Sequence, residues 1–219
     1  MAVITISRDL GSGGLDIAVQ VAKTLGYELV DKRTAETIFR QYGLTRFDEV
    51  YDSAPNLLDL VNANNLLIVS MLNEIVRAVA RRGNTVVLGR AGFAILEGYA
   101  DVLHVRVQAP FADRVQRVMD RERLTDRQAV EERVREDDEV HRKYVKFFYN
   151  KEWDESSNFA LVLDSGSVSA NAAVEQIVAA AKALDQQSRS KEASSTAMIE
   201  VDPVLADAVA KAITYPLPS

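Results

Sequence analysis

The segment Val3–Ala18, "VITISRDLGSGGLDIA", joins an apolar run to a glycine-rich turn and then to a helical pattern. Glycines at a strand-to-helix turn let backbone N–H groups converge, and the N-terminus of the helix adds positive partial charge. The turn "GSGG", formed by Gly11, Ser12, Gly13 and Gly14, is therefore suited to holding an anion such as a phosphate group. The simpler alternative is a glycine-rich turn that only fits the helix to the sheet.

The same turn departs from the Walker A pattern, Gly-x-x-x-x-Gly-Lys-Ser/Thr, in which a lysine reaches the phosphates. When Gly13 is placed on the last glycine of that pattern, Arg8 stands at the first glycine. Gly14 then takes the lysine position, and Leu15 takes the position of the hydroxyl residue. Three of the four fixed positions differ, so the motif alone does not identify a nucleotide site.

Short apolar runs alternate with helical patterns over residues 1–185, which we expect to form one domain. We predict five strands at Val3–Ile6, Tyr27–Asp31, Asn84–Arg90, Asp101–Val107 and Phe159–Gly166. Strands that alternate with helices in this way predict a three-layer α/β fold with a central, mostly parallel, five-stranded sheet.

Two stretches between the predicted strands carry separate predictions, one of a loop and one of a long helix. The polar stretch over residues 45–56 predicts a loop or mobile flap. The long helical stretch over residues 57–82 is apolar on more than one face. Because such a helix needs cover on several sides, we expect it to pack against a second copy of the chain in a homodimer.

The composition of the chain changes after Asp185. Residues 186–201 are polar and aperiodic, which predicts a linker or a disordered segment. Residues 202–219 then predict a C-terminal helix and tail, with Asp202 as the cap and Pro203 in the first turn. This helix docks either on the body of the domain or on another subunit, and the sequence leaves both alternatives open.

Composition excludes several classes of function. The chain of 219 residues has a formal net charge of −6, which gives no general reason to expect a nucleic acid or an anionic membrane as a partner. It has no cysteine and 2 histidines, so thiolate chemistry is excluded and a histidine-rich zinc site is not expected. No stretch approaches the roughly 18 apolar residues of a membrane span, and no secretory signal is visible. We expect a cytoplasmic protein.

The order of these segments resembles the cytidylate-kinase-like family of P-loop proteins. The resemblance covers roughly residues 2–184 and rests on "ITISRDLGSGGLDIA", "GYELVDKR", "VVLGRAGFAIL" and "LTDRQAVEERVREDDEVHRKYVKFFYNKEW". It implies a P-loop NTPase fold of the nucleoside monophosphate kinase type, with a helical acceptor flap over residues 32–82 and a lid over residues 120–145. It also implies phosphoryl transfer that depends on ATP and Mg²⁺, with a nucleotide such as CMP or dCMP as the small-molecule substrate.

The resemblance places the ATP phosphates on Gly11–Gly14 and Leu15, with Arg8 beside them. Arg8 follows the first strand at the carboxyl end of the sheet, where ligands bind in such folds. A surface salt bridge from Arg8 to Asp9 or Asp31 is the alternative.

The acceptor side is assigned by the resemblance to Arg90 and Asp31. Arg90 follows a glycine at the end of a predicted strand and would hold the acceptor. Asp31 either orders the flap through Lys32 and Arg33 or caps the next helix.

The charged region from Arg121 to Arg142 matches the lid of the family. The resemblance implies that arginines of this lid reach the transferred phosphoryl group. The candidates are Arg121, Arg142 and Arg123 as catalytic residues, with Arg133 and Asp138 as substrate-binding residues; Arg121 and Arg142 are preferred. An ion-paired, solvated helix explains most of these charges equally well. Asp16 is a candidate Mg²⁺ ligand, but a carboxylate in a first helical turn is favoured by the helix dipole anyway, and we favour that interpretation.

Departures from the family pattern keep other functions open. Cytidylate kinases carry carboxylates where this chain has Leu88 and Ala91, and usually read Asn-Thr-Ser where it has "LDSGS". With the missing lysine, these differences favour a catalytically silent nucleotide- or anion-binding module that acts through a partner or a dimer. A kinase for a non-nucleotide substrate is a third possibility.

Overall fold

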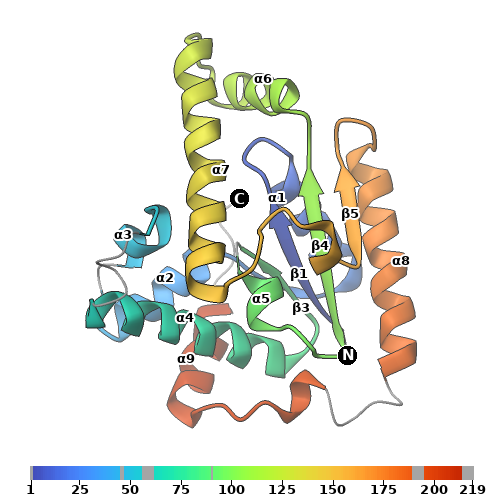
Figure 1. The fold of residues 1–219 in the computed structure, drawn as a ribbon. Coiled ribbons are helices and arrows are strands. Elements are labelled where there is room, and N and C mark those ends of the chain that lie inside the picture. The colour runs from blue at the N-terminus through green and yellow to red at the C-terminus, as the bar shows by residue number, and fades with distance from the viewer. Residues whose placement is uncertain (1, 45–46, 56–61, 90, 189–194, 214–219) are drawn as a thin grey trace.

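The computed structural model describes residues 2–44, 47–55, 62–89, 91–188 and 195–213. Within these residues, five strands form one sheet in the order β2-β3-β1-β4-β5 (Figure 1). Every pairing in the sheet is parallel. The strands are β1 (Val3–Arg8), β2 (Glu28–Val30), β3 (Thr85–Leu88), β4 (Val102–Gln108) and β5 (Leu161–Asp164). The predicted five-stranded parallel sheet is confirmed.

Helices cover both faces of the sheet, which gives the predicted three layers. On one face, Ile4 and Ile6 of β1 are buried against α1 (Gly14–Leu25) and α8 (Ala170–Ser188). Val3 belongs to the core on the opposite face. Side chains of a strand alternate between its two faces, so one short strand contributes to both cores.

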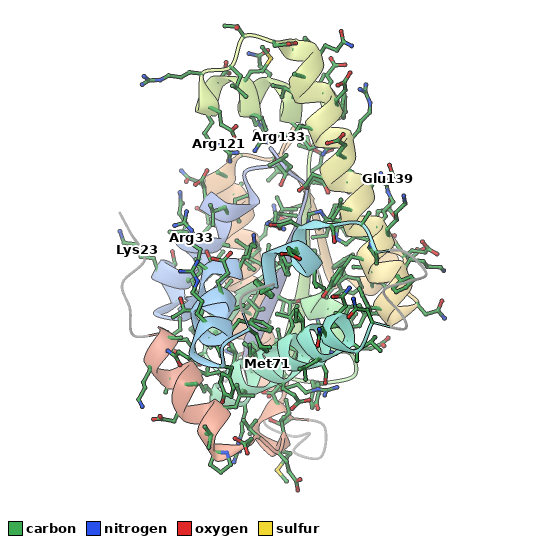
Figure 2. All side chains as sticks on the ribbon, turned by 90° about the vertical axis from the view of Figure 1, so that its left-hand side faces the viewer. Lys23, Arg33, Met71, Arg121, Arg133 and Glu139 are labelled. Atoms are coloured by element: carbon green, nitrogen blue, oxygen red, sulfur yellow. The ribbon has the colours of Figure 1, made fainter. Side chains whose placement is uncertain are left out.

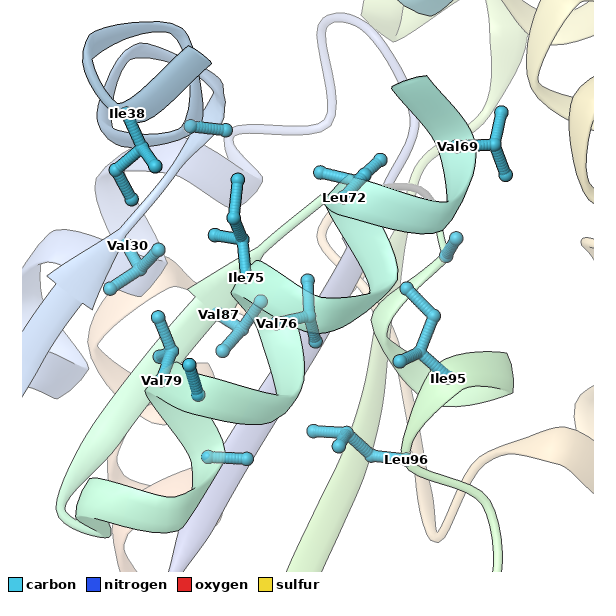
Figure 3. Close-up of a cluster of buried hydrophobic side chains, with 14 of the residues drawn as sticks. Val30, Ile38, Val69, Leu72, Ile75, Val76, Val79, Val87, Ile95 and Leu96 are labelled. Atoms are coloured by element: carbon cyan, nitrogen blue, oxygen red, sulfur yellow. The ribbon is translucent and has the colours of Figure 1, made fainter. Parts of the chain in front are cut away.

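The opposite face is covered chiefly by α2 (Lys32–Gln41), α4 (Ala63–Arg82) and α5 (Gly92–Ile95). Figure 3 shows Leu72, Ile75 and Val76 of α4 lying between Ile38 of α2 and Ile95 of α5, over the sheet. Of the stretch predicted as helical over residues 57–82, residues 57–61 lie outside the described residues, and α4 accounts for the rest.

Part of the stretch predicted as a loop is helical. Helix α3 (Phe47–Asp52) lies within residues 45–56, and its Phe47, Val50 and Tyr51 are buried. Phe47 stacks on Phe39 of α2 with ring centroids 4.4 Å apart. These three apolar residues have the i, i+3, i+4 spacing of one helical face, and their burial offsets the polar character of the rest of the stretch.

Helices α6 (Phe111–Glu122) and α7 (Arg127–Tyr149) form a hairpin that extends beyond the carboxyl end of β4 (Figures 1 and 2). The two helices share a small apolar cluster of Val115, Val118, Val130 and Val134. The hairpin occupies the predicted lid region. This cluster is separate from the cores on the sheet, but the C-terminal half of α7 is anchored in the core on one face of the sheet by Tyr144 and Val145.

Residues 195–213 lie against the body of the domain. Helix α8 continues to Ser188, into the predicted linker, and a short 3₁₀ turn η4 follows at Thr196–Met198. Thr196 is buried and donates from its N–H and its hydroxyl to Asp101, at 2.9 and 2.8 Å. Helix α9 (Pro203–Ile213) then packs against α2 and α4. Of the two alternatives for this helix, docking on the body is the one observed.

This docking changes the argument for a homodimer. Much of the apolar surface of α4 is covered within the chain by the sheet, α5, η4 and α9 (Figure 1). Leu66 and Leu67 of α4 are exposed. The chain's own C-terminal helix therefore explains only part of the feature that led us to expect a second subunit, and the homodimer stays a prediction. In the part of the chain that is described, no helix combines the length and apolarity needed to cross a membrane.

Candidate functional site

The glycine-rich turn has a backbone that only glycine adopts readily. Gly11 and Gly13 have φ angles of 82° and 75°, in the left-handed region. A Cβ at Gly11 would lie 2.5 Å from the carbonyl oxygen of Arg114, so no larger residue fits there. Helix α1 begins at Gly14, and the first N–H groups of a helix have no partner within it. The loop therefore presents backbone donors at the carboxyl end of β1.

A pocket of about 210 Å³ opens at this loop. We call it the loop pocket; its lining residues are Arg8, Asp9, Leu10, Gly11, Gly13, Gly14, Leu15, Asp16, Arg121 and Asp137. Ser12 does not line the pocket: it is buried, and its hydroxyl donates to the carbonyl oxygen of Asp9 at 2.8 Å. Ser12 therefore shapes the loop from behind.

Side chains from other elements hold the loop from its outer side. Arg114 and Arg117 of α6 donate to the carbonyl oxygens of Leu10 and Gly11, each at 3.5 Å. The hydroxyl of Ser165, after β5, donates to the carbonyl oxygen of Ser12 at 2.7 Å and accepts from Arg117 at 2.8 Å. Three successive carbonyl groups are thereby turned away from the pocket, which fixes the orientation of the loop peptides.

A buried ionic network lies beneath the loop. Arg106 of β4 donates to the Asp9 carboxylate at 2.7 Å and lies over the Trp153 ring, 4.2 Å from its centroid. Arg114 donates to both oxygens of Asp138, at 2.9 and 2.8 Å. Burial raises the pKa of the Asp9 carboxyl, and the charges of Arg106 and Arg114 oppose that shift. The sequence analysis missed this network; an arginine inside the apolar strand "DVLHVRV" was the signal.

Arg8 makes neither of the ion pairs considered as its alternative role. Asp9 is bound to Arg106, and the Asp31 side chain caps α2 by accepting from the N–H groups of Arg33 and Thr34, at 2.9 and 3.2 Å. Arg8 instead lines the loop pocket, with its Nη1 3.3 Å from Nε2 of His141. For Asp31, the helix-capping alternative is the one observed.

A second pocket, of about 40 Å³, lies at the carboxyl ends of β2 and β3. We call it the apolar pocket; its lining residues are Val30, Asp31, Lys32, Ala35, Tyr51, Leu72, Ile75, Val76, Val87, Leu88, Gly89, Ala91, Gly92 and Ile95. Leu88 and Ala91, which stand where the family resemblance implies carboxylates, are buried in its wall. Arg90, predicted to bind the acceptor, lies outside the described residues.

The structure separates the predicted lid residues. Arg121 lines the loop pocket and pairs with Glu122 at 2.9 Å. Figure 2 shows Arg121 and Arg133 on the α6–α7 hairpin, and Arg133 also pairs with Glu122. Arg123 ends α6 with a left-handed φ of 56°.

The remaining two lid residues do not line the loop pocket. Arg142 is exposed and pairs with Asp154 at 3.4 Å. Asp138 is buried, and its carboxylate is taken up by Arg114, so it has a structural partner rather than an open face toward a ligand. Asp138 and Arg142 therefore have separate partners, Arg114 and Asp154.

Three carboxylate residues, Asp9, Asp16 and Asp137, line the loop pocket, and Asp9 is already bound to Arg106. Among the described residues, no group of three or more acidic or histidine side chains is arranged to hold a metal by itself. Mg²⁺ at phosphoryl-transfer sites is held by one or two carboxylates together with phosphate oxygens and waters. The donors at the loop pocket therefore fit Mg²⁺ that arrives with a nucleotide, and Asp137 joins the predicted Asp16 as a candidate.

Proteins of similar sequence match most of the chain. A model of the cytidylate kinase-like family matches residues 3–167. The cytidylate kinase of Pyrobaculum neutrophilum is 31% identical over 179 residues, which cover 80% of this chain and 89% of that protein. The cytidylate kinase of Ignicoccus hospitalis is 28% identical over 177 residues, which cover 81% of this chain and 97% of that protein.

Solved structures agree on the fold. An uncharacterized protein from Eubacterium ventriosum aligns with a TM-score of 0.60 at 18% identity, over 83% of this chain and 99% of the other. Shikimate kinase from Bacteroides thetaiotaomicron aligns with a TM-score of 0.52 at 10% identity, over 83% of this chain and 98% of the other. The predicted fold of P-loop kinases is confirmed. With the match over residues 3–167, the chain belongs to the cytidylate kinase-like family.

Proposed function

We propose that this chain transfers the terminal phosphoryl group of ATP to a small acceptor, with CMP or dCMP as the first expected acceptors. The observation that carries the proposal is the braced glycine loop: its peptides are turned by Arg114, Arg117 and Ser165 so that the loop opens on a pocket with cationic side chains. Phosphoryl transfer depends mainly on positioning and on positive charge around the phosphates. The named cytidylate kinases among the relatives support the same class of reaction.

On the donor side, the N–H groups at Gly13, Gly14 and Leu15 would hold the ATP phosphates at the positive end of α1. Arg8 of β1 and Arg121 of α6 add positive charge to the lining of the loop pocket. Asp16 and Asp137 would hold Mg²⁺, which neutralises charge on the phosphate oxygens when it is bound.

On the acceptor side, the apolar pocket at β2 and β3 would take the base of the nucleotide, with Asp31 and Lys32 at its polar edge and Arg90 as the proposed phosphate ligand. Its volume of about 40 Å³ is smaller than a nucleotide needs, so the proposal requires the pocket to widen when the acceptor binds. Leu88 and Ala91 in its wall supply no carboxylate that could bind the base of a nucleotide. We therefore expect weaker discrimination between bases than a carboxylate-lined site would give. Arg123, Arg133 and Arg142 remain proposed lid residues that would act after the hairpin has moved.

The alternative function, a silent nucleotide-binding module, is favoured by the glycine at position 14 in place of the lysine and by Leu15, Leu88 and Ala91. Two measurements on the purified chain separate the alternatives. Calorimetry with Mg-ATP reports binding, and a radiolabelled phosphate transfer assay reports turnover with CMP, dCMP, UMP, AMP, GMP and the non-nucleotide acceptor shikimate. Binding with transfer supports the kinase, binding without any transfer supports the module, and the absence of binding contradicts both.

A matched pair of glycine variants tests whether the loop carries the binding. Gly13 and Gly43 have φ angles of 75° and 71°, and a Cβ at either position meets nothing within 4 Å. Gly13→Ala and Gly43→Ala therefore impose similar backbone strain, about 1 kcal/mol or more. We expect Gly13→Ala to weaken Mg-ATP binding at least tenfold. Gly43→Ala, which lies away from the loop pocket, should leave binding unchanged.

A further inference from the structure

The space that a P-loop lysine would need is occupied in this chain by Arg8. A Cβ placed on Gly14, the residue at the lysine position, would lie 2.5 Å from Cβ and 2.9 Å from Cγ of Arg8. Non-bonded carbon atoms keep about 3.5–4.0 Å between them, so the two side chains exclude each other. The arginine at the end of β1 and a lysine at the start of α1 are therefore alternative ways to place a cation at this loop.

The guanidinium of Arg8 keeps its charge available to a ligand. Of the other described arginines around the loop, Arg106, Arg114 and Arg121 are paired with the carboxylates of Asp9, Asp138 and Glu122. Arg117 is held by the carbonyl oxygen of Gly11 and by Ser165. Among the described residues, the partner of the Arg8 guanidinium is an imidazole, Nε2 of His141 at 3.3 Å, and no carboxylate is paired with it.

The contacts of His141 assign a role to each of its ring nitrogens. Its Nδ1 lies 2.7 Å from the backbone carbonyl oxygen of Asp137 and 3.2 Å from the Asp137 carboxylate, both of which can only accept, so Nδ1 carries a hydrogen. Its Nε2 faces Arg8, which can only donate, so Nε2 is the acceptor. An imidazole in this form directs the guanidinium without cancelling its charge.

His141 is also well fixed in place. The residue is 2% exposed, and its ring stacks on Trp153 with centroids 4.7 Å apart and planes 30° apart. Trp153 in turn lies against Arg106 of the buried network. The acceptor atom that meets Arg8 is thus held from two sides, which lowers the conformational entropy that Arg8 loses when it binds a ligand.

We propose that Arg8 is the phosphate-binding cation that replaces the P-loop lysine, and that neutral His141 is the positioning residue that holds Arg8 over the loop. This inference rests on the proposed function, because the ATP phosphates are its ligand. A guanidinium suits the role, since it keeps its charge at all physiological pH values and can bind two phosphate oxygens at once. The two residues act as one unit across the loop pocket.

The test is a double-mutant cycle on Mg-ATP affinity, measured by calorimetry. Arg8→Gln keeps the carbon atoms that pack on Gly14 and should weaken binding about 10- to 100-fold, the effect of losing a charge-assisted hydrogen bond. Arg8→Lys, which keeps the charge, should lose less. His141→Leu should weaken binding about tenfold, and His141→Gln, whose amide oxygen can accept from Arg8, should recover most of that loss.

The cycle distinguishes positioning from a general structural effect. In the Arg8→Gln background, His141→Leu should have no further effect on affinity, because its target is absent. Arg127→Gln, which removes an exposed arginine paired with Glu131 on α7, serves as the matched control and should bind like the wild type.

Two results overturn the inference. Arg8→Gln that binds Mg-ATP as the wild type does would overturn it while the proposed function stands, and so would additive effects of the Arg8 and His141 substitutions. A wild-type chain that binds no Mg-ATP would instead overturn the proposed function, and the inference with it. Thermal unfolding of each variant shows that the compared proteins are folded.

Discussion

The loop pocket and the apolar pocket open at the same edge of the sheet, but they are built from different kinds of side chains. Buried ion pairs and arginine-to-carbonyl hydrogen bonds support the loop pocket. Aliphatic side chains of β2, β3, α4 and α5 form most of the apolar pocket. The strength of a hydrogen bond or ion pair depends on direction and distance, whereas the packing of aliphatic side chains depends chiefly on their volume.

This difference bears on what each pocket determines. The loop pocket has an orientation that is set before any ligand binds, which suits a ligand common to many kinases. The apolar pocket carries few polar groups, of which Asp31 and Lys32 are already engaged with the N-terminus of α2 and with Asp52. The choice of acceptor therefore rests on few polar groups there, and the following substitutions test this division.

Breaking the buried pair below the loop should have the largest effect. Arg114→Leu leaves the Asp138 carboxylate buried without its guanidinium partner, and we expect the free energy of unfolding to fall by about 3–5 kcal/mol. Urea unfolding followed by circular dichroism measures the loss. The double variant Arg114→Leu/Asp138→Leu removes both charges and should recover much of the stability. If the free energy of unfolding of the single variant lies within about 1 kcal/mol of the wild-type value, the pair does not support the loop.

Truncation in the apolar pocket should come next. Leu72→Ala removes a buried side chain from the pocket wall, and we expect about 2–4 kcal/mol of destabilisation with a raised KM for the acceptor. The affinity for Mg-ATP should not change. Ile177→Ala, in the core on the other face of the sheet, is the matched control: it should cost similar stability and leave the acceptor KM as it is. Equal effects of both variants on KM would contradict the division.

A pH change should affect stability at a place away from both pockets. Desolvation by burial lowers the pKa of His104 to about 4 from 6.5, and its Nδ1 lies 2.8 Å from the Thr5 hydroxyl. The unfolded chain therefore binds a proton that the folded chain does not between these pH values. The free energy of unfolding should fall as pH is lowered from 6.5 toward 4, by on the order of 2 kcal/mol from this group.

Comparison with a non-titrating variant isolates the effect of His104. His104→Asn keeps a polar group near Thr5 and should show a smaller decrease between pH 6.5 and 4.5 in urea unfolding. Identical pH dependence in both proteins would assign the decrease to other groups.

Loosening the loop should have the smallest effect. Ser165→Ala removes the hydroxyl that joins Arg117 to the carbonyl oxygen of Ser12, and we expect Mg-ATP affinity to fall about fivefold, or about 1 kcal/mol. Ser167→Ala is the control, because that hydroxyl bonds only locally to the carbonyl oxygen of Asp164. Unchanged affinity in Ser165→Ala would mean that Arg117 and the loop glycines hold the loop without it.

The elements of the fold could be predicted because they depend on local patterns. Each strand of the sheet lies at an apolar run bounded by turn residues, and the loop pocket lies at the glycine turn. Helix α3 was missed although Phe47, Val50 and Tyr51 have helical spacing, because the polar residues around them dominated the interpretation.

The support of the site could not be predicted in the same way. Arg106 and Asp9 are 97 residues apart in sequence, and Ser165 and Ser12 are 153 apart. No local periodicity reports such a contact. For the same reason, Arg8 was identified as a candidate while its partner His141, 133 residues away, was not.

By itself, the sequence determined the parallel α/β fold, the glycine loop at the end of the first strand and the absence of a lysine there. Hydrophobic alternation and glycine backbone preferences act over a few residues, so they can be read directly from the chain. Only the tertiary structure decided that the C-terminal helix covers α4, that Arg114 and Arg117 hold the loop, and that Arg8 occupies the space of the lysine. These features depend on which side chains meet when distant segments pack, and that is a property of the folded chain.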